Sequence, residues 1–219
     1  MGLERRELTS RNTTWARSLA RKLAHAGVTP NAISIFSIAC AGLALNCFIY
    51  ADHQRIVGES WRPFILLGAF FIQLRLVCNL MDGMVAVEHG KKTVLGDIFN
   101  DAPDRIADAF ILMGAAFVAI GPHRIDFGWL CTALAILTAY FRTLAGAVGA
   151  KQRYLGPMAK QHRMATVTAA CALVAIFPSL EYDGHNLMDA ALLVVAVGAL
   201  FTCWRRLSAM VADLKGESV

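Results

Sequence analysis

Charged residues are scarce in this sequence. Asp, Glu, Lys and Arg make up 17% of its 219 residues, and 57% are hydrophobic. A typical soluble domain carries about 25% charged residues. The mean hydropathy of +0.51 agrees with this balance. The composition therefore disfavours a soluble protein and predicts a polytopic membrane protein that forms a single domain over residues 1–219.

Cysteine pairs are absent as well. The six cysteines lie singly in apolar runs, and none belongs to a C-x-x-C pair. This pattern disfavours a disulfide framework or a zinc site and indicates small side chains buried among helices. A cleavable signal peptide is not expected either, because the first thirty residues carry several charges and no continuous apolar core.

Long apolar stretches are abundant. With its flanks, each of six stretches can supply about 20 helical residues, the length that a hydrocarbon core of about 30 Å requires. The stretches are continuous rather than alternating, which favours helices over the strands of a barrel. The sequence predicts an all-α protein with six transmembrane helices, within residues 33–50, 63–86, 98–120, 127–141, 164–180 and 187–204.

The charges between these stretches alternate in sign. Segment 1–25 holds six basic and two acidic residues, and segment 151–163 holds four basic residues and no acidic one. Segment 181–189 instead holds three acidic residues and no basic one. Because cytoplasmic segments are enriched in Lys and Arg, both chain ends and segments 88–95 and 151–163 are predicted to be cytoplasmic. The expected location is the cytoplasmic (inner) membrane.

A short basic segment precedes the first long apolar stretch. In residues 13–26, Trp15, Leu19 and Leu23 recur at helical spacing, whereas Arg17 and Arg21 lie elsewhere on the helix. This pattern is typical of an amphipathic helix on the membrane surface, near anionic head groups. Residues 1–31 are predicted to form a cytoplasmic juxtamembrane helix, and residues 32–213 a bundle of six helices.

Acidic residues gather in segment 79–108, which contains six of the 16 in the chain. Carboxylates at a bilayer boundary are costly, so the cluster predicts a functional site. Asn79 and Asp82 share one face at the end of a predicted helix, and Asn100 and Asp104 share one face at the start of the next. A hairpin over 88–95 would bring these faces together. Their oxygen atoms suit Mg²⁺ or Mn²⁺.

The spacing in this segment resembles the signature of the CDP-alcohol phosphotransferases, D-x2-D-G-x2-A-R-x8-G-x3-D-x3-D. All spacings are kept over 26 residues, by Asn79, Asp82, Gly83, Ala86, Val87, Gly96, Asn100 and Asp104. The resemblance covers most of the chain. It implies an enzyme of phospholipid biosynthesis that transfers a phosphatidyl-type group from a CDP-linked lipid, such as CDP-diacylglycerol, to a hydroxyl acceptor and releases CMP.

The resemblance also implies roles for these residues. Asp82 and Asp104 would be the catalytic carboxylates, with Asp104 as the general base. In the family two divalent ions are usually shared by these positions, so the resemblance implies that Asn79, Asp82, Asn100 and Asp104 would bind them. The nucleotide would be bordered by Gly83, Ala86 and Gly96. The expected partners are the CDP-linked lipid donor, a small alcohol or lipid acceptor, the bilayer and a second copy in a homodimer. No nucleic acid is expected.

Three positions differ from the signature. Asn79 and Asn100 replace acids, and Val87 replaces an arginine. An amide oxygen can ligate a metal but brings no charge, so the four anions of the signature fall to two. The alternative is therefore a metal-poor, non-catalytic protein of the same fold that binds lipid or nucleotide. A small transporter is a further alternative, although no internal repeat is evident.

Several cations are candidates for phosphate binding or charge pairing. Arg75 lies one turn before Asn79, inside an apolar stretch, and is predicted to pair with Asp108. Arg105 is a candidate to replace the missing arginine of the signature. Phosphate or acceptor binding is also predicted for the basic residues Arg142, Arg153, Lys160 and Arg163. The sequence does not identify the acceptor alcohol or the number of metal ions.

Overall fold

The structure is a computed structural model that describes residues 13–88 and 96–216. Regular structure in these ranges consists of helices, with one isolated β-bridge between Tyr182 and His185. The prediction of an all-α protein is therefore confirmed. The helices are α1 (Thr14–His25), α2 (Pro30–Ile56), α3 (Arg62–Glu88), α4 (Gly96–Val118), α5 (Arg124–Ala147), α6 (Lys160–Ile176) and α7 (Leu187–Lys215).

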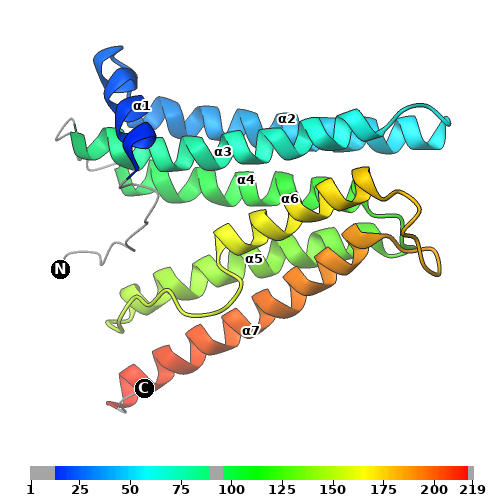
Figure 1. The fold of residues 1–219 in the computed structure, drawn as a ribbon. Helices are drawn as coiled ribbons and strands as arrows, with labels where there is room; N and C mark the ends of the chain where they lie inside the picture. The colour runs from blue at the N-terminus through cyan, green and yellow to red at the C-terminus, as the bar shows by residue number, and fades with distance from the viewer. Residues whose placement is uncertain (1–12, 89–95, 217–219) are drawn as a thin grey trace.

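The long helices form one elongated bundle. Helices α2, α3 and α4 lie side by side, α5, α6 and α7 form a second group, and α1 crosses the bundle at one end (Figure 1). The end of α3, the start of α4 and the ends of α5 and α7 lie at that same end (Figure 1). The residues of the acidic cluster and of the basic segment are thereby brought to one side of the molecule.

Among the described residues, four helices are long and apolar enough to cross a membrane. They comprise residues Pro30–Ile56, Arg62–Ala86, Arg124–Ala147 and Leu187–Lys215. Helix α4 carries several charged residues in its first half, and α6 has only 17 residues. The protein is therefore an integral membrane protein with four candidate spans, whereas the predicted total of six depends on α4 and α6.

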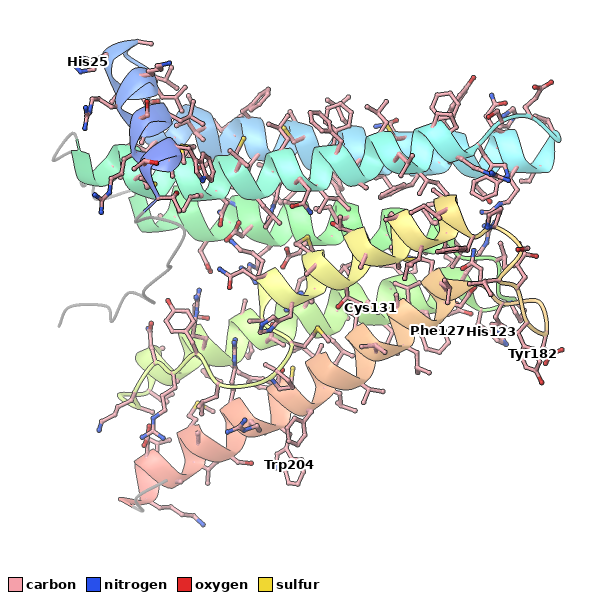
Figure 2. All side chains as sticks on the ribbon, in the orientation of Figure 1. His25, His123, Phe127, Cys131, Tyr182 and Trp204 are labelled. Carbon is pink, nitrogen blue, oxygen red and sulfur yellow. The ribbon has the colours of Figure 1, made fainter. Side chains whose placement is uncertain are left out.

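Small residues fill the centre of the bundle, and many large apolar side chains point outwards. Ala44 of α2 and Ala115 of α4 are fully buried, whereas Trp204 is 64% exposed. In Figure 2, Trp204 projects from the outer side of α7, and Cys131 lies between helices. Small residues at helix contacts and large apolar residues on the outer surface are typical of helices packed in lipid. All six cysteines are free and five are buried, as predicted.

Helix α2 is longer than predicted. The sequence placed Asp52 and Arg55 in a connecting segment, but both belong to the last turns of α2. Arg55 donates to the carbonyl oxygens of Phe117 (2.8 Å) and Val118 (3.1 Å), at the end of α4. Arg124 donates to both carboxylate oxygens of Asp52, at 2.7 and 2.9 Å. The apolar pattern of α2 therefore ends before the helix does. Its last turns carry charged side chains instead, and Arg55 donates to carbonyl oxygens at the end of α4 that lack partners within that helix.

Helix α1 begins and ends within one residue of the predicted segment. Its buried residues are Ala16, Ala20 and Ala24, which recur every four residues and pack in one cluster with residues of α3. Trp15, predicted on the apolar face, is 51% exposed. The alanine stripe lets the two helix backbones approach closely, and Leu19 and Leu23 are partly buried against the same cluster.

Candidate active site

Asp104 lies at the centre of the site. It is buried in the first half of α4, and three donors from two other helices surround its carboxylate. Oδ1 accepts hydrogen bonds from Asn79 Nδ2 (2.9 Å) and Arg75 Nη2 (3.0 Å), both on α3. Oδ2 lies 2.5 Å from Nζ of Lys160, the first residue of α6. The predicted meeting of the faces of α3 and α4 is confirmed for Asn79 and Asp104.

Lys160 bridges two positions of the predicted metal motif. Its Nζ lies 2.5 Å from Asn79 Oδ1 as well as from Asp104 Oδ2. The sequence placed Lys160 in a surface segment, but α6 begins at this residue and directs it inwards, so that its side chain is only 22% exposed. Lys160 is therefore part of the centre of the site.

Asp82 lies on α3, one turn after Asn79, and is 5% exposed. Its Oδ2 accepts a hydrogen bond of 2.9 Å from Ser34 Oγ of α2. Ser34 lies in the second turn of α2, which begins with Pro30 after the capping residue Thr29. The start of α2 thus positions the second carboxylate of the site.

Asp108 forms a deeper layer below Asp104. It is 1% exposed and forms ion pairs with Arg75 (3.3 Å) and with Arg163 of α6 (2.6 Å). The predicted pairing of Arg75 with Asp108 is therefore confirmed. Arg163, predicted to bind phosphate or acceptor, is itself 1% exposed and directed towards Asp108. Its first-turn position on α6 turns the guanidinium into the bundle rather than towards the surface.

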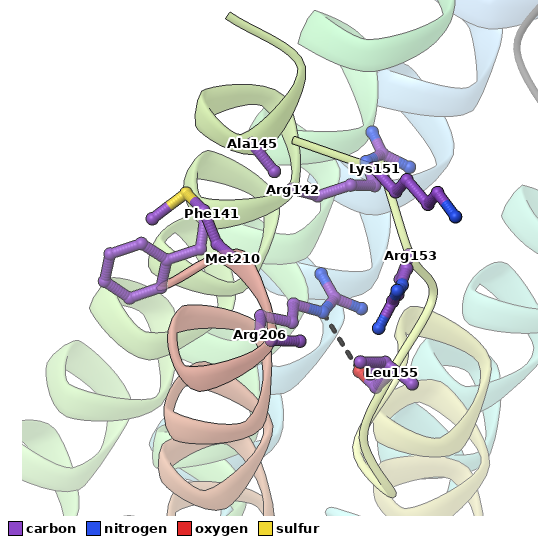
Figure 3. A pocket seen from close by; sticks show the side chains of 9 residues that line it. Phe141, Arg142, Ala145, Lys151, Arg153, Leu155, Arg206 and Met210 are labelled. Carbon is purple, nitrogen blue, oxygen red and sulfur yellow. Dashed lines mark hydrogen bonds between the residues drawn. The ribbon is translucent and has the colours of Figure 1, made fainter. Parts of the chain in front are cut away.

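A basic pocket lies beside the acidic residues, between the ends of α5 and α7 and the segment before α6 (Figure 3). Arg142, Lys151, Arg153 and Arg206 line it together with apolar side chains. Arg206 is held by a 3.0 Å hydrogen bond from Nε to the carbonyl oxygen of Leu155 (Figure 3).

Three ion pairs connect this basic pocket to the acidic centre. Arg142 donates to Asp101 Oδ1 of α4 at 2.6 Å. Arg105 lies 3.8 Å from Asp101 and 3.9 Å from Asp104, so its guanidinium stands between the two carboxylates. Predicted anion-binding residues and the predicted general base therefore belong to one continuous site.

Part of the predicted motif lies at or beyond the edge of the described residues. The hairpin is outside the described ranges between residues 89 and 95, and nothing is described of the Asn100 side chain. Gly96 is the first residue of α4, and Gly83 and Ala86 lie on α3 near Asp82. The proposed roles of these four residues stay predictions.

Sequence reasoning missed three features of the site. Ser34 gave no signal beyond being a small polar residue in an apolar stretch, and Arg206, just after the last predicted span, was assigned no role. Lys160 was predicted at the periphery. For Lys160 and Arg206, positive charge next to an apolar stretch is the available signal, but it does not tell an inward side chain from one that faces the membrane surface.

The described donors include two carboxylates of the kind that binds a divalent ion. Asp82 and Asp104 supply carboxylate oxygens, and magnesium is commonly bound by one or two carboxylates together with substrate phosphates. No group of three or more His, Cys, Asp or Glu side chains converges as a metal site within residues 13–88 and 96–216. In addition, Lys160 already bridges Asn79 and Asp104.

Comparisons with known proteins agree with the predicted family. The chain is 25% identical over 202 residues to the phosphatidylinositol phosphate synthase of Mycolicibacterium smegmatis, covering 89% of this chain and 83% of that protein. Its fold is similar to the crystal structures of the Mycobacterium tuberculosis phosphatidylinositol phosphate synthase. For the form with CDP-DAG bound, the TM-score is 0.73 at 20% identity, over 90% of this chain and 94% of that one.

A second crystal structure of the M. tuberculosis protein is in complex with manganese and citrate. It gives a TM-score of 0.74 at 20% identity and covers 90% of each chain. The family model described as CDP-alcohol phosphatidyltransferase matches residues 27–204 of this chain. These residues include the whole acidic site, most of the basic pocket and five of the six long helices in full. The chain therefore belongs to the CDP-alcohol phosphatidyltransferase family of membrane transferases.

Proposed function

We propose that this protein transfers the phosphatidyl group of CDP-diacylglycerol to an inositol phosphate or a similar phosphorylated polyol and releases CMP. The observation that carries the proposal is the buried carboxylate of Asp104, positioned by three donors and continuous with a pocket lined by four basic residues. The relatives compared above are named phosphatidylinositol phosphate synthases. Because the inositol group of such a product carries a phosphate, these names support a phosphorylated acceptor.

Asp104 is proposed as the general base. It accepts the proton of the acceptor hydroxyl, the acceptor oxygen bonds to the phosphorus that carries diacylglycerol, and the bond from this phosphorus to the CMP oxygen breaks. The electron pair of that bond leaves with CMP. Asn79 and Arg75 hold Oδ1, which leaves Oδ2 directed towards Lys160 and the acceptor.

Asp82 and Asp104 would hold a divalent cation, Mg²⁺ or Mn²⁺, which when bound neutralises charge on the diphosphate. Arg105 is proposed to contact a phosphate of the donor, because it stands beside Asp104 at the border of the basic pocket. Asn100 is proposed as a further oxygen ligand. Gly83, Ala86 and Gly96 are proposed to border the nucleotide, where the absence of long side chains allows close approach.

The basic pocket is proposed to bind the phosphate of the acceptor. Arginine pairs with phosphate through two parallel hydrogen bonds, and several cations in a partly enclosed pocket favour a dianion over a neutral alcohol. The residues proposed for this role are Arg142, Lys151, Arg153 and Arg206. Arg163 instead supports Asp108, since its guanidinium is buried below the site.

The proposed membrane arrangement has six spans. Helices α4 and α6 lie alongside the four candidate spans (Figure 1), and the buried charges of α4 have partners within the bundle. The alternating charges favour a cytoplasmic site and cytoplasmic chain ends, with α1 lying at the membrane surface. A single domain over residues 1–219 and a homodimer stay predictions from the sequence and from the resemblance.

One observation favours the second candidate function, that of a non-catalytic lipid- or nucleotide-binding protein. Lys160 occupies oxygens of Asn79 and Asp104 that the resemblance assigns to metal. A protein of this kind would bind CDP-diacylglycerol with no dependence on divalent metal and would release no CMP with any acceptor.

The test uses the purified full-length protein with CDP-diacylglycerol, Mg²⁺ or Mn²⁺ and a panel of acceptors. CMP release is measured for inositol phosphate, glycerol phosphate, inositol, glycerol and serine. We expect turnover with a phosphorylated acceptor and a raised KM for that acceptor in Arg142→Gln. Arg62→Gln, an exposed arginine at the opposite end of the bundle, is the matched control. Absence of CMP release with every acceptor would refute the proposed activity.

A further inference from the structure

Lys160 stands between two side chains that the family signature assigns to a metal ion. Its ammonium nitrogen is 2.5 Å from an oxygen of Asn79 and 2.5 Å from an oxygen of Asp104. An ammonium group has three donors. With two directed at Asn79 and Asp104, the third is available to a phosphate oxygen, and the 22% exposure of the side chain allows access to one.

Among the described residues, the carboxylates around Lys160 already have cationic partners in the protein. Asp104 and Asp108 contact Arg75, Asp108 contacts Arg163, and Asp104 contacts Lys160. Asp82 is the remaining buried carboxylate near them. Arg105 also lies 3.9 Å from Asp104. We call this set the buried charge cluster; its four cations and three anions are Arg75, Arg105, Lys160, Arg163, Asp82, Asp104 and Asp108.

The same count limits how many divalent ions the donor can bring. The diphosphate of CDP-diacylglycerol carries about two negative charges at neutral pH. One divalent ion would neutralise the diphosphate, whereas a second would add two positive charges to a cluster in which cations already outnumber anions. Asn79 lacks the negative charge that the signature has at this position, and Lys160 beside it adds a positive charge. Both features therefore lower the positive charge that bound metal ions must supply.

We propose that Lys160 takes the place of one of the two divalent ions of the family, so that this chain binds a single ion with its donor. The ammonium then supplies the second positive charge beside the diphosphate and holds Asn79 and Asp104 in position. This inference rests on the proposed transfer from a CDP-linked lipid. A salt bridge with a purely structural role would instead leave the number of bound ions at two.

The first measurement is the number of Mn²⁺ ions bound per chain, from electron paramagnetic resonance of free Mn²⁺ with and without CDP-diacylglycerol. We expect one ion per chain for the parent with the lipid. The double variant Asn79→Asp/Lys160→Met restores a carboxylate and removes the ammonium, so we expect two ions and the spectral broadening that closely spaced Mn²⁺ ions produce.

The second measurement is Mn²⁺ affinity without lipid. Lys160→Met and Lys160→Gln remove a positive charge next to Asp104, so binding should tighten at least about tenfold. Lys215→Met, the same change at an exposed residue in the last turn of α7, should leave the affinity unchanged. Two variants at position 160 guard against a folding defect in one of them, and thermal unfolding identifies such a defect.

Three results would overturn the inference: two Mn²⁺ ions in the parent, none in the parent, or unchanged affinity in both folded variants at Lys160. The proposed function is judged separately by CMP release. Two bound ions together with CMP release would reject only the role of Lys160. Absence of CMP release with every acceptor would reject the transferase proposal, whatever the number of ions.

Discussion

At the scale of single residues, the site is built from carboxylates that each have several partners. Asp104 is contacted by Arg75, Asn79 and Lys160, so its orientation does not depend on any one of them. Such multiple contacts place a carboxylate accurately for proton transfer, and they make the two acids of the signature different from each other. Asp82 has Ser34 as its described side-chain partner, and we expect it to act as a metal ligand rather than as a base.

We expect Asp104→Asn to lower CMP release by about 10²-fold or more, because an amide cannot accept the proton of the acceptor at neutral pH. Asp82→Asn should keep a base but weaken Mn²⁺ binding by the loss of one anion. The measurements are CMP release and Mn²⁺ titration on variants that still unfold cooperatively. Near-normal turnover of Asp104→Asn would remove the assignment of this residue as the base.

Asp108 provides a prediction about stability. Its replacement by Asn leaves the guanidinium groups of Arg75 and Arg163 without their shared carboxylate in a buried site. Breaking a buried ion pair in this way costs about 3–5 kcal/mol. Asp126→Asn is the control, since its pair with His123 is 76–80% exposed and such pairs contribute about 0–1 kcal/mol. Equal melting temperatures for the two variants would contradict the prediction.

Individual contacts of the site were predictable only where the residue spacing allowed two charges to meet and leaving one of them unpaired would have been costly. The pairing of Arg75 with Asp108 followed from an unpaired cation in an apolar stretch and an acid one turn deeper on the neighbouring helix. The inward direction of Lys160 did not follow, because it depends on α6 beginning at this residue rather than later. Helix starts without a capping side chain, such as that of α6, leave little signal in the sequence.

At the scale of helices, the packing of α2, α3 and α4 depends on one aromatic ring. Phe48 of α2 is fully buried and lies against Gly68 of α3 and Gly114 of α4. A Cβ atom at Gly114 would lie 2.7 Å from Phe48 Cδ2, and one at Gly68 would overlap the same ring. The two glycines therefore create the space that the ring occupies.

We predict that Gly68→Ala lowers the melting temperature in detergent, with a cost of about 1–3 kcal/mol from overpacking. Gly42→Ala is the matched control on α2, because a Cβ there would meet its nearest neighbour, the ring of Phe110, at 3.8 Å. Phe48→Val should restore part of the stability lost in Gly68→Ala. A melting temperature that falls equally in both alanine variants would argue against a specific clash.

The positions of the helices were predictable from apolar stretches, and their ends were not. Each predicted span corresponds to an observed helix, but α2 continues past Tyr50 and α7 past Trp204. The extra turns contain charged residues that have partners on other elements, as for Asp52 with Arg124 and for Asp213 with Arg153. Hydropathy detects residues in contact with lipid, whereas these turns are stabilised by tertiary ion pairs.

At the scale of the whole molecule, the charges of the connecting segments agree with the end of the bundle at which each segment lies. The segments predicted to be cytoplasmic follow the ends of α3, α5 and α7, which lie at one end of the bundle (Figure 1). The segment between α6 and α7 carries acidic residues and lies at the other end, where Figure 2 places Tyr182. The family, the transferase class and divalent-metal use within the family were predicted from motif spacing and agree with the comparisons.

The sidedness of the site can be tested with cysteines in exposed positions at the two ends of the bundle. In inverted and right-side-out vesicles, Ala147→Cys should react with an impermeant maleimide only from the cytoplasmic side. Glu181→Cys should react only from the opposite side. The six native cysteines supply the background, which is expected to be low because five are buried. Labelling of Ala147→Cys from outside would reverse the orientation and the location of the site.

The pairing of charges in the buried charge cluster has a consequence for protein in the cell that has no bound metal ion. Because cations of the protein already neutralise its carboxylates, we expect folding and membrane insertion to proceed without a metal ion. Chelation with EDTA should therefore stop turnover while leaving the melting temperature nearly unchanged. When divalent metal is scarce, the cell would retain folded but inactive protein. This protein would regain activity as soon as the cation and the lipid donor bind.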